Sequence, residues 1–83
     1  MAVRVRVRLG AGLYRLAAAP LLTVDLADGA TVDDLLEHLR ASEPDLAPAL
    51  RAALPVVDGE QVRRDRHLAD RQEVALLLPV SGG

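Results

Sequence analysis

Hydrophobic and polar residues alternate along the first part of the chain. Val3, Val5, Val7 and Leu9 alternate with arginines. This period of two predicts a half-buried strand over residues 3–9, with one aliphatic and one cationic face. A second alternating segment over residues 22–26 predicts another strand. The glycine-containing segment between the two strands indicates an antiparallel hairpin with a loose connection, in which residues 13–20 could form a short helical turn.

The next segment has the period of a helix. Apolar residues follow one another at i, i+3, i+4 and i+7, at Val32, Leu35, Leu36 and Leu39. Thr31 can cap this helix by accepting a hydrogen bond from the amide of Asp34, and Pro44 ends the helix near Ser42. Residues 44–50 predict a second short helical segment that covers the core.

The C-terminal half predicts a hairpin and a final strand. Asp58 and Gly59 favour the two positive-φ positions of a type I′ turn within residues 56–62. Residues 73–80 are apolar on both faces, as in a central strand. Because the chain crosses over the helix between its halves, the first and last strands are expected to be parallel neighbours. This ββαββ order, a mixed sheet with one main helix on one face, predicts an α+β fold of the β-grasp (ubiquitin-like) type. We expect one domain, 1–83, with a flexible tail, 79–83.

Composition and charge exclude several classes of function. The 83 residues are 51% hydrophobic and 27% charged, with a formal net charge of -2. This composition argues against a disordered chain. The lack of a net positive charge, together with a single aromatic residue, argues against a nucleic-acid partner. No apolar run is long enough to span a membrane, and there is no cysteine for a disulfide or a thiolate metal site. We expect a cytoplasmic protein without a membrane partner.

The end of the chain carries the clearest candidate chemistry. The segment Pro79, Val80, Ser81, Gly82, Gly83 reaches up to about 17 Å beyond a folded domain. Two terminal glycines remove side-chain bulk, so that the tail can enter a narrow channel in another protein. The terminal carboxyl, with an ordinary pKa of about 3.3–3.7, is ionised at neutral pH and could attack the α-phosphate of ATP.

The chain resembles the MoaD/ThiS family of ubiquitin-like sulfur carriers over nearly its whole length. The resemblance rests on residues 29–39 at the helix, 57–60 at the hairpin, and 73–76 continuing into 79–83. The length, the insert at 44–54 and the ending Pro-Val-Ser-Gly-Gly look more like the molybdopterin branch of the family than the thiamine branch.

The resemblance implies that the chain is a protein carrier of sulfur. An E1-like activating enzyme would adenylate the Gly83 carboxylate with ATP, and sulfur from a donor would replace AMP to give a thiocarboxylate. The tail, residues 79–83, would then insert into the large subunit of molybdopterin synthase, which passes the sulfur to a pterin precursor. The chain itself would bind no cofactor and would be a non-catalytic small subunit.

Two departures from the family pattern leave alternatives open. Arg71 and Gln72 stand where a Gly-Asp pair usually precedes the last strand, which suggests a differently shaped turn. Leu78 stands where the molybdopterin branch often has a second proline. A carrier for thiamine, cysteine or a sulfur-containing natural product therefore remains an alternative, as does a ubiquitin-like protein modifier or interaction domain.

Two groups of residues are candidates for binding partners or ligands. Either Ala75 and Leu77, or Val74, Leu76 and Leu78, should face away from the helix, and exposed leucines on a small domain favour a partner. The predicted docking face comprises Ala75, Leu76, Leu77, Leu78, Arg4, Arg6 and Arg8. The arginines could bind an acidic partner surface, but an ordinary solvated strand face is the favoured alternative for them. Asp65, His67 and Asp70 lack a fourth ligand, and no catalytic constellation has suitable spacing, so that we expect no metal and no independent enzyme activity.

Overall fold

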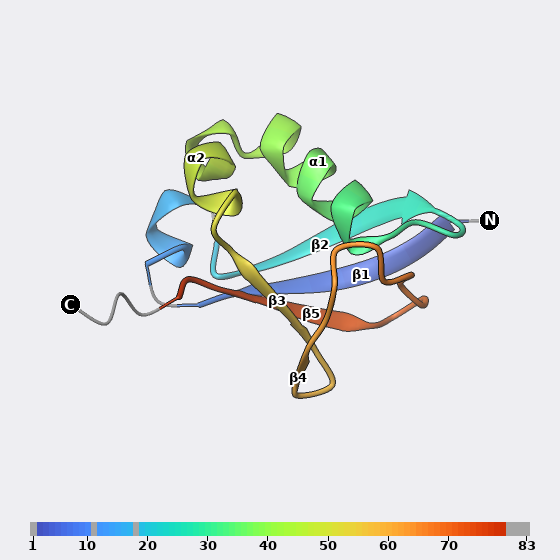
Figure 1. Ribbon diagram of the computed structural model, residues 1–83. Coiled ribbons are helices and arrows are strands. Elements are labelled where there is room, and N and C mark those ends of the chain that lie inside the picture. The colour runs from blue at the N-terminus through green and yellow to red at the C-terminus, as the bar shows by residue number, and fades with distance from the viewer. Residues whose placement is uncertain (1, 11, 18, 80–83) are drawn as a thin grey trace.

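A five-stranded mixed sheet with helices on one face makes up the protein (Figure 1). The computed structural model describes residues 2–10, 12–17 and 19–79. Within them, the strands are β1 (Ala2–Leu9), β2 (Leu21–Ala27), β3 (Leu54–Val57), β4 (Glu60–Gln61) and β5 (Glu73–Leu77). The helices are α1 (Val32–Ser42) and α2 (Ala47–Leu50), and the 3-10 turns are η1 (Tyr14–Leu16) and η2 (Pro44–Leu46).

The strand order is β2-β1-β5-β3-β4, in which β1 and β5 are parallel and all other neighbours are antiparallel. The predicted β-grasp fold, the parallel pair and the central place of the last strand are confirmed. The ββαββ order was one strand short, because the second arm of the 56–62 hairpin is the two-residue strand β4. Asp58 and Gly59 adopt φ values of 53° and 79° between the arms, as a type I′ turn requires.

The alternation along β1 becomes a two-faced strand. Val3, Val5, Val7 and Leu9 are buried against the helices, while the arginines between them are exposed on the outer face of the sheet. The core that forms on the inner face is entirely aliphatic and, among the described residues, contains no buried polar or charged side chain. The inner face of the sheet therefore forms the hydrophobic core, and the outer face is not covered by the helices.

The predicted N-cap of α1 forms, and a second hydrogen bond makes it a capping box. Thr31 Oγ1 accepts from the amide of Asp34 at 3.3 Å, and the Asp34 carboxylate accepts from the amide of Thr31 at 2.9 Å, which completes a capping box. The helix ends at Ser42, two residues before Pro44. Pro44–Leu46 and Ala47–Leu50 then form the two short helical turns expected over the core.

The polar segment between β4 and β5 joins the two ends of the helical layer. The carbonyls of Arg64 and Arg66 accept from the amides of Asp33 and Val32 at 2.8 and 2.9 Å, in the first turn of α1. The guanidinium of Arg64 donates at 3.0–3.3 Å to three carbonyls at the end of α2, those of residues 50, 51 and 53. Helix ends leave such backbone groups unpaired, so this segment supplies their missing partners.

Candidate functional site

The chain leaves the sheet at the end of its central strand. β5 lies between β1 and β3, and its Leu76 carbonyl accepts from the amide of Gly10 at 2.9 Å. A Cβ on Gly10 would lie 2.7 Å from Leu77 Cδ2 and 3.2 Å from the Leu76 carbonyl oxygen. Gly10 thus allows the segment after β1 to lie directly against the end of β5, and a bulkier residue there would push Leu77 aside.

Leu78 anchors the last described turn of the chain. Its side chain is half-buried and packs against the hydrophobic core, whereas the next residue, Pro79, is exposed. The Leu78 Cδ1 atom lies 3.1 Å from the position that a Cβ on Gly12 would occupy, and Gly12 has a φ of +88°. The core therefore determines where the C-terminal segment begins, which is the structural consequence of leucine at this position.

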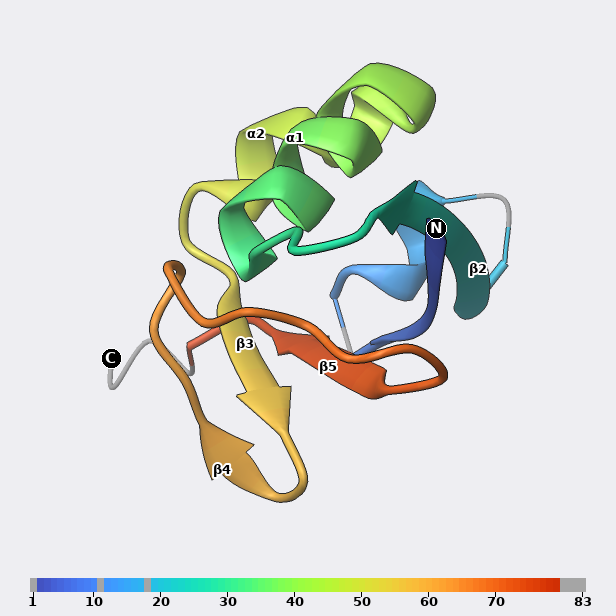
Figure 2. The same ribbon diagram turned by 90° about the vertical axis from the view of Figure 1, so that its right-hand side faces the viewer.

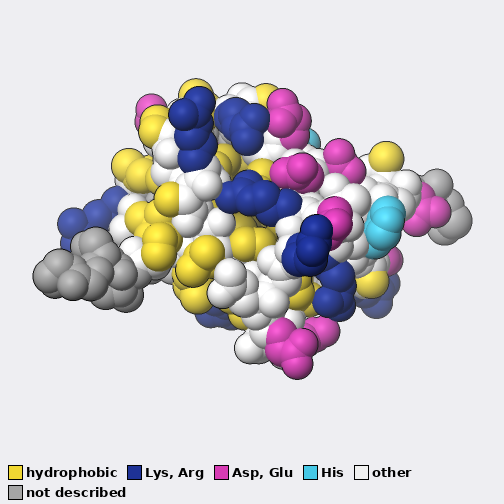
Figure 3. Space-filling view, viewed as in Figure 1, with side chains coloured by type: hydrophobic (Ala, Val, Ile, Leu, Met, Phe, Trp, Pro, Cys, Tyr) yellow, Lys and Arg dark blue, Asp and Glu magenta, His cyan; other side chains and the backbone are white. Residues whose placement is uncertain are grey.

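The outer face of the sheet is apolar near the end of β5. Ala75 and Leu77 of β5 lie opposite Val56 and Leu54 of β3, which are half-buried on the same face. Leu77 is 41% exposed. We call these four residues, Leu54, Val56, Ala75 and Leu77, the outer apolar patch. Figure 3 shows hydrophobic side chains gathered towards this end of the molecule, and acidic side chains towards the other end.

One part of the predicted docking face is wrong. Leu76 has no exposed surface, because it points to the helices together with Val74, so it belongs to the core and cannot contact a partner. Leu78 also packs against the core and is only partly accessible. Of the two faces left open by the sequence, the one with Ala75 and Leu77 is on the outside. Leu54 and Val56 were missed, although their alternation with Pro55 and Val57 could have placed them there.

The arginine column lies on the same outer face as the apolar patch. The Arg8 guanidinium is 3.3 Å from Glu73 Oε2 on β5, and that of Arg4 is 2.9 Å from Asp25 Oδ1 on β2. The hydrogen bond from Arg4 lowers the pKa of Asp25 below its ordinary value, and the same bond raises the pKa of Arg4. Arg6, between the two, is exposed and forms no ion pair with the described residues.

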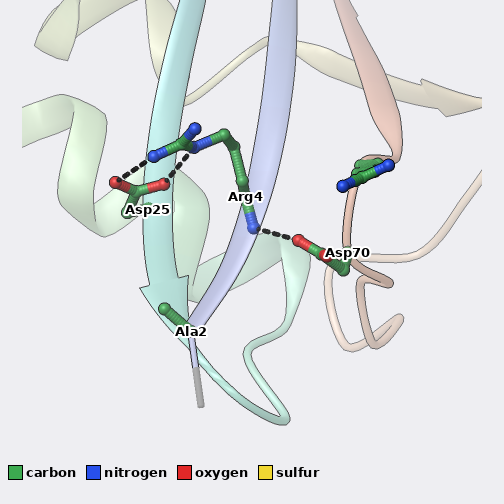
Figure 4. A pocket seen from close by; sticks show the side chains of 5 residues that line it. Ala2, Arg4, Asp25 and Asp70 are labelled. Carbon is green, nitrogen blue, oxygen red and sulfur yellow. Dashed lines mark hydrogen bonds and ion pairs between the residues drawn. The ribbon is translucent and has the colours of Figure 1, made fainter.

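Asp65, His67 and Asp70 make separate interactions. Asp65 accepts from Arg63 at 3.3 Å, and His67 Nδ1 lies 2.8 Å from the carbonyl oxygen of Gly29. Asp70 accepts from the backbone amide of Arg4 at 2.8 Å, beside the Arg4–Asp25 pair (Figure 4). No group of three metal-ligating side chains occurs within residues 2–10, 12–17 and 19–79.

The remaining predicted site residues, Val80, Ser81, Gly82 and Gly83, lie outside the described residues. The last described residue before them is Pro79, which is exposed and follows Leu77 of the outer apolar patch by two positions. Among the helices of the described residues, none has the length and apolar character that crossing a membrane requires.

Comparison with known proteins decides the family. The model of the ThiS family matches residues 7–83. The chain belongs to this family. It is 38% identical over 63 residues to the molybdopterin synthase sulfur carrier subunit of Chlamydomonas reinhardtii, which covers 74% of this chain and 76% of that protein. The chain is thus a small ubiquitin-like sulfur carrier protein of the MoaD/ThiS type, as the resemblance over nearly its whole length implied.

Solved structures share the same fold. Small archaeal modifier protein 1 of Haloferax volcanii superimposes with a TM-score of 0.85 at 26% identity, covering 94% of this chain and 99% of that one. The ubiquitin of Caldiarchaeum subterraneum superimposes with a TM-score of 0.69 at 17% identity, and each chain is covered completely. At that identity the second likeness shows the fold alone.

Proposed function

We propose that Gly83 of this carrier is converted to a thiocarboxylate that donates sulfur in molybdopterin biosynthesis. The observation that carries this proposal is the match of the family to residues 7–83, which include the C-terminal glycines, together with the curated relative at 38% identity. The relative is named as a subunit of molybdopterin synthase, so its large-subunit partner is the expected acceptor for this chain.

The proposed reaction has two steps, both catalysed by a partner. In an E1-like enzyme, a carboxylate oxygen of Gly83 attacks the α-phosphorus of ATP, pyrophosphate leaves, and an acyl adenylate forms. A sulfur donor at the sulfide level then attacks the acyl carbon, and AMP leaves. A C–O bond is replaced by a C–S bond without net oxidation. In this proposal the carrier contributes the reacting carboxylate and itself binds neither ATP nor a metal. We propose that the reaction takes place in the cytoplasm.

The experiment is mass spectrometry after alkylation. The full chain is incubated with ATP, sulfide and an E1-like enzyme, and then treated with a thiol-alkylating reagent. Because the chain contains no cysteine, a thiocarboxylate is the only group expected to react as a thiol. Alkylation also distinguishes sulfur incorporation from oxidation of Met1, which adds nearly the same mass.

The expected result is one alkyl group mapped to Gly83. The matched control is a variant with one alanine appended after Gly83, in which the reacting carboxylate is displaced and no label is expected. Absence of label on the native chain, while a known carrier is labelled by the same enzyme, contradicts the proposal. Transfer of the sulfur to a purified molybdopterin synthase large subunit separates this pathway from the alternatives of thiamine, cysteine or a natural product.

We further propose that the outer apolar patch, flanked by Arg4, Arg6 and Arg8, docks the activating enzyme and the acceptor. Leu77 is exposed and lies two residues before Pro79, where the tail begins. A partner that binds Leu77 would therefore hold the start of the tail close to itself. Leu77→Asp should weaken binding of an E1-like enzyme at least about tenfold, since hot-spot residues at interface centres have effects of this size. Unchanged binding overturns this assignment.

Leu16→Asp is the matched control for that test. Leu16 is 39% exposed, nearly the same as Leu77, but it lies in η1 on the helical side of the sheet (Figure 1). Leu16→Asp should leave the affinity for the E1-like enzyme unchanged. Thermal unfolding of both variants shows whether any loss of binding arises from loss of the fold.

Protein modification is the second candidate function. The observation that favours it is the likeness to small archaeal modifier protein 1, with a TM-score of 0.85 at 26% identity. In that case the activated Gly83 carboxyl would be attacked by a lysine amine of a target protein, and an amide would form. Conjugates of higher mass in a lysate, without an alkylatable thiocarboxylate, would favour this candidate over sulfur transfer.

A further inference from the structure

The two edges of the sheet differ in length. One edge is β4, which has two residues. The other edge is β2, which has seven residues, contains neither proline nor lysine, and lies at the rim of the sheet in Figure 2. Soluble proteins usually shorten or interrupt an edge strand, because its unpaired backbone groups can bind another strand. β2 shows neither device.

The register with β1 identifies the unpaired groups. Leu21 lies opposite Arg8, and the amide of Leu9 donates to the carbonyl of Pro20 at 2.8 Å. In an antiparallel pair this pattern directs the amides and carbonyls of residues 22, 24 and 26 towards β1. The amides and carbonyls of residues 21, 23, 25 and 27 then point away from the sheet. Within the part of the chain that the structure describes, one of these groups has a local partner: the Ala27 carbonyl accepts from the amide of Ala30 at 3.1 Å.

The side chains on this edge are complementary to a second copy. If two β2 strands pair antiparallel about Val24, Thr23 of each copy lies opposite Asp25 of the other. The two residues would form hydrogen-bonded backbone pairs, since their free groups face outwards. The Thr23 hydroxyl could also donate to the facing carboxylate, which remains 58% exposed in its pair with Arg4.

Other registers are less favourable. Pairing about Asp25 places two carboxylates opposite each other, which is destabilising. Pairing about Thr23 places Asp25 opposite Leu21 and leaves the carboxylate without a donor on the partner strand. The arrangement about Val24 therefore satisfies both backbone and side chains. It also places Val24 opposite its copy on the inner face, where it continues the core.

We infer that the protein forms a two-fold dimer through the free edge of β2, in the register Thr23 opposite Asp25. The two sheets become one continuous sheet, with both outer apolar patches on the same face. Since β5 is two strands away from this edge, the C-terminal ends of both copies of β5 remain accessible and point in opposite directions. The inference is independent of the proposed sulfur chemistry.

Opposite charges at Thr23 test both the surface and the register. The dissociation constant of the full-length chain is measured by sedimentation equilibrium from micromolar to millimolar concentration. Thr23→Lys places two new opposite-charge pairs in the dimer, and should lower the dissociation constant about 2- to 30-fold. Thr23→Asp places two like-charge pairs there and should raise it by a similar factor. The gain with lysine should decrease at high salt.

The matched controls are Gln61→Lys and Gln61→Asp, the same changes on the opposite edge strand β4, which should leave the dissociation constant unchanged. A native chain that stays monomeric up to millimolar concentration overturns the inference. Equal weakening of the dimer by both Thr23 variants would also overturn it, because it would indicate another register. No effect of either variant would overturn it as well, because it would indicate another surface. Binding of a partner protein's extended strand at this edge, in place of a second copy, would also overturn it.

Discussion

At the scale of single residues, Arg71 adopts an unusual backbone conformation. Its φ is +66°, in the left-handed region, and its amide donates to the Arg4 carbonyl at 2.6 Å. The sequence suggested a differently shaped turn here, because arginine stands where the family usually has glycine. The conformation instead is one that glycine adopts without strain, so the turn keeps a glycine-like backbone and Arg71 carries the steric cost.

Arg71→Gly should therefore stabilise the protein. The left-handed conformation costs a non-glycine residue roughly 1–2 kcal/mol, and the greater freedom of glycine in the unfolded chain offsets about 0.5–1 kcal/mol of that gain. We expect the free energy of unfolding to rise by about 0.5–1 kcal/mol in urea titration. Arg71→Ala is the control, since it removes the guanidinium but keeps the strain. Equal stabilisation by both variants would show that the side chain, not the backbone, is responsible.

The pKa of Asp25 should lie below the ordinary value for an aspartate. The hydrogen bond from Arg4 favours its ionised form in the folded protein. The Arg4–Asp25 pair thus contributes to stability above the ordinary Asp pKa of about 3.9, and this contribution is lost as pH falls through the lower folded-state value. Carboxyl chemical shifts followed by NMR measure the difference. In Arg4→Gln the pKa of Asp25 should return towards its ordinary value; no change would refute the stated cause.

At the scale of the elements, the capping box determines where α1 begins. Thr31 and Asp34 satisfy each other's amides, while Val32 and Asp33 donate to the 62–72 segment. Thr31→Ala removes one acceptor and should cost about 1 kcal/mol of unfolding free energy, within a range of roughly 0.5–2. Thr31→Ser, which keeps the hydroxyl, should retain most of the stability. A loss in serine as large as that in alanine would indicate that the methyl group matters more than the cap.

Several elements follow from local pattern, and others depend on neighbours distant in sequence. The alternation in β1, the stripe of α1 and the Asp58–Gly59 turn each identify one element and its inner face. β5 is different, because Val74 to Leu78 are apolar on both faces and the period of two gives no inner side. Burial of Leu76 and exposure of Leu77 are decided by pairing with β1 and β3. The role of Arg64 at the end of α2 likewise requires the folded chain.

At the scale of the whole molecule, the tail could be recognised from sequence but its surroundings could not. The ending of the chain indicated a slender segment with an accessible carboxylate, and the family resemblance added the carrier chemistry. The outer apolar patch combines Leu54 and Val56 with Ala75 and Leu77, from strands about twenty residues apart. It exists only because β3 and β5 pair in this register.

The stability of the whole molecule depends on an aliphatic core without aromatic residues. Leu36, in α1, is completely buried in this core. Leu36→Ala should lower the free energy of unfolding by about 2–5 kcal/mol, through lost burial and a residual cavity. This is a large fraction of the roughly 5–15 kcal/mol typical of a domain, so the melting temperature should fall by about 10 °C or more. Leu16→Ala, the same truncation at an exposed position, should change stability by less than about 0.5 kcal/mol. If calorimetry gave similar losses for both variants, the core would not have the packing that the structure assigns to it.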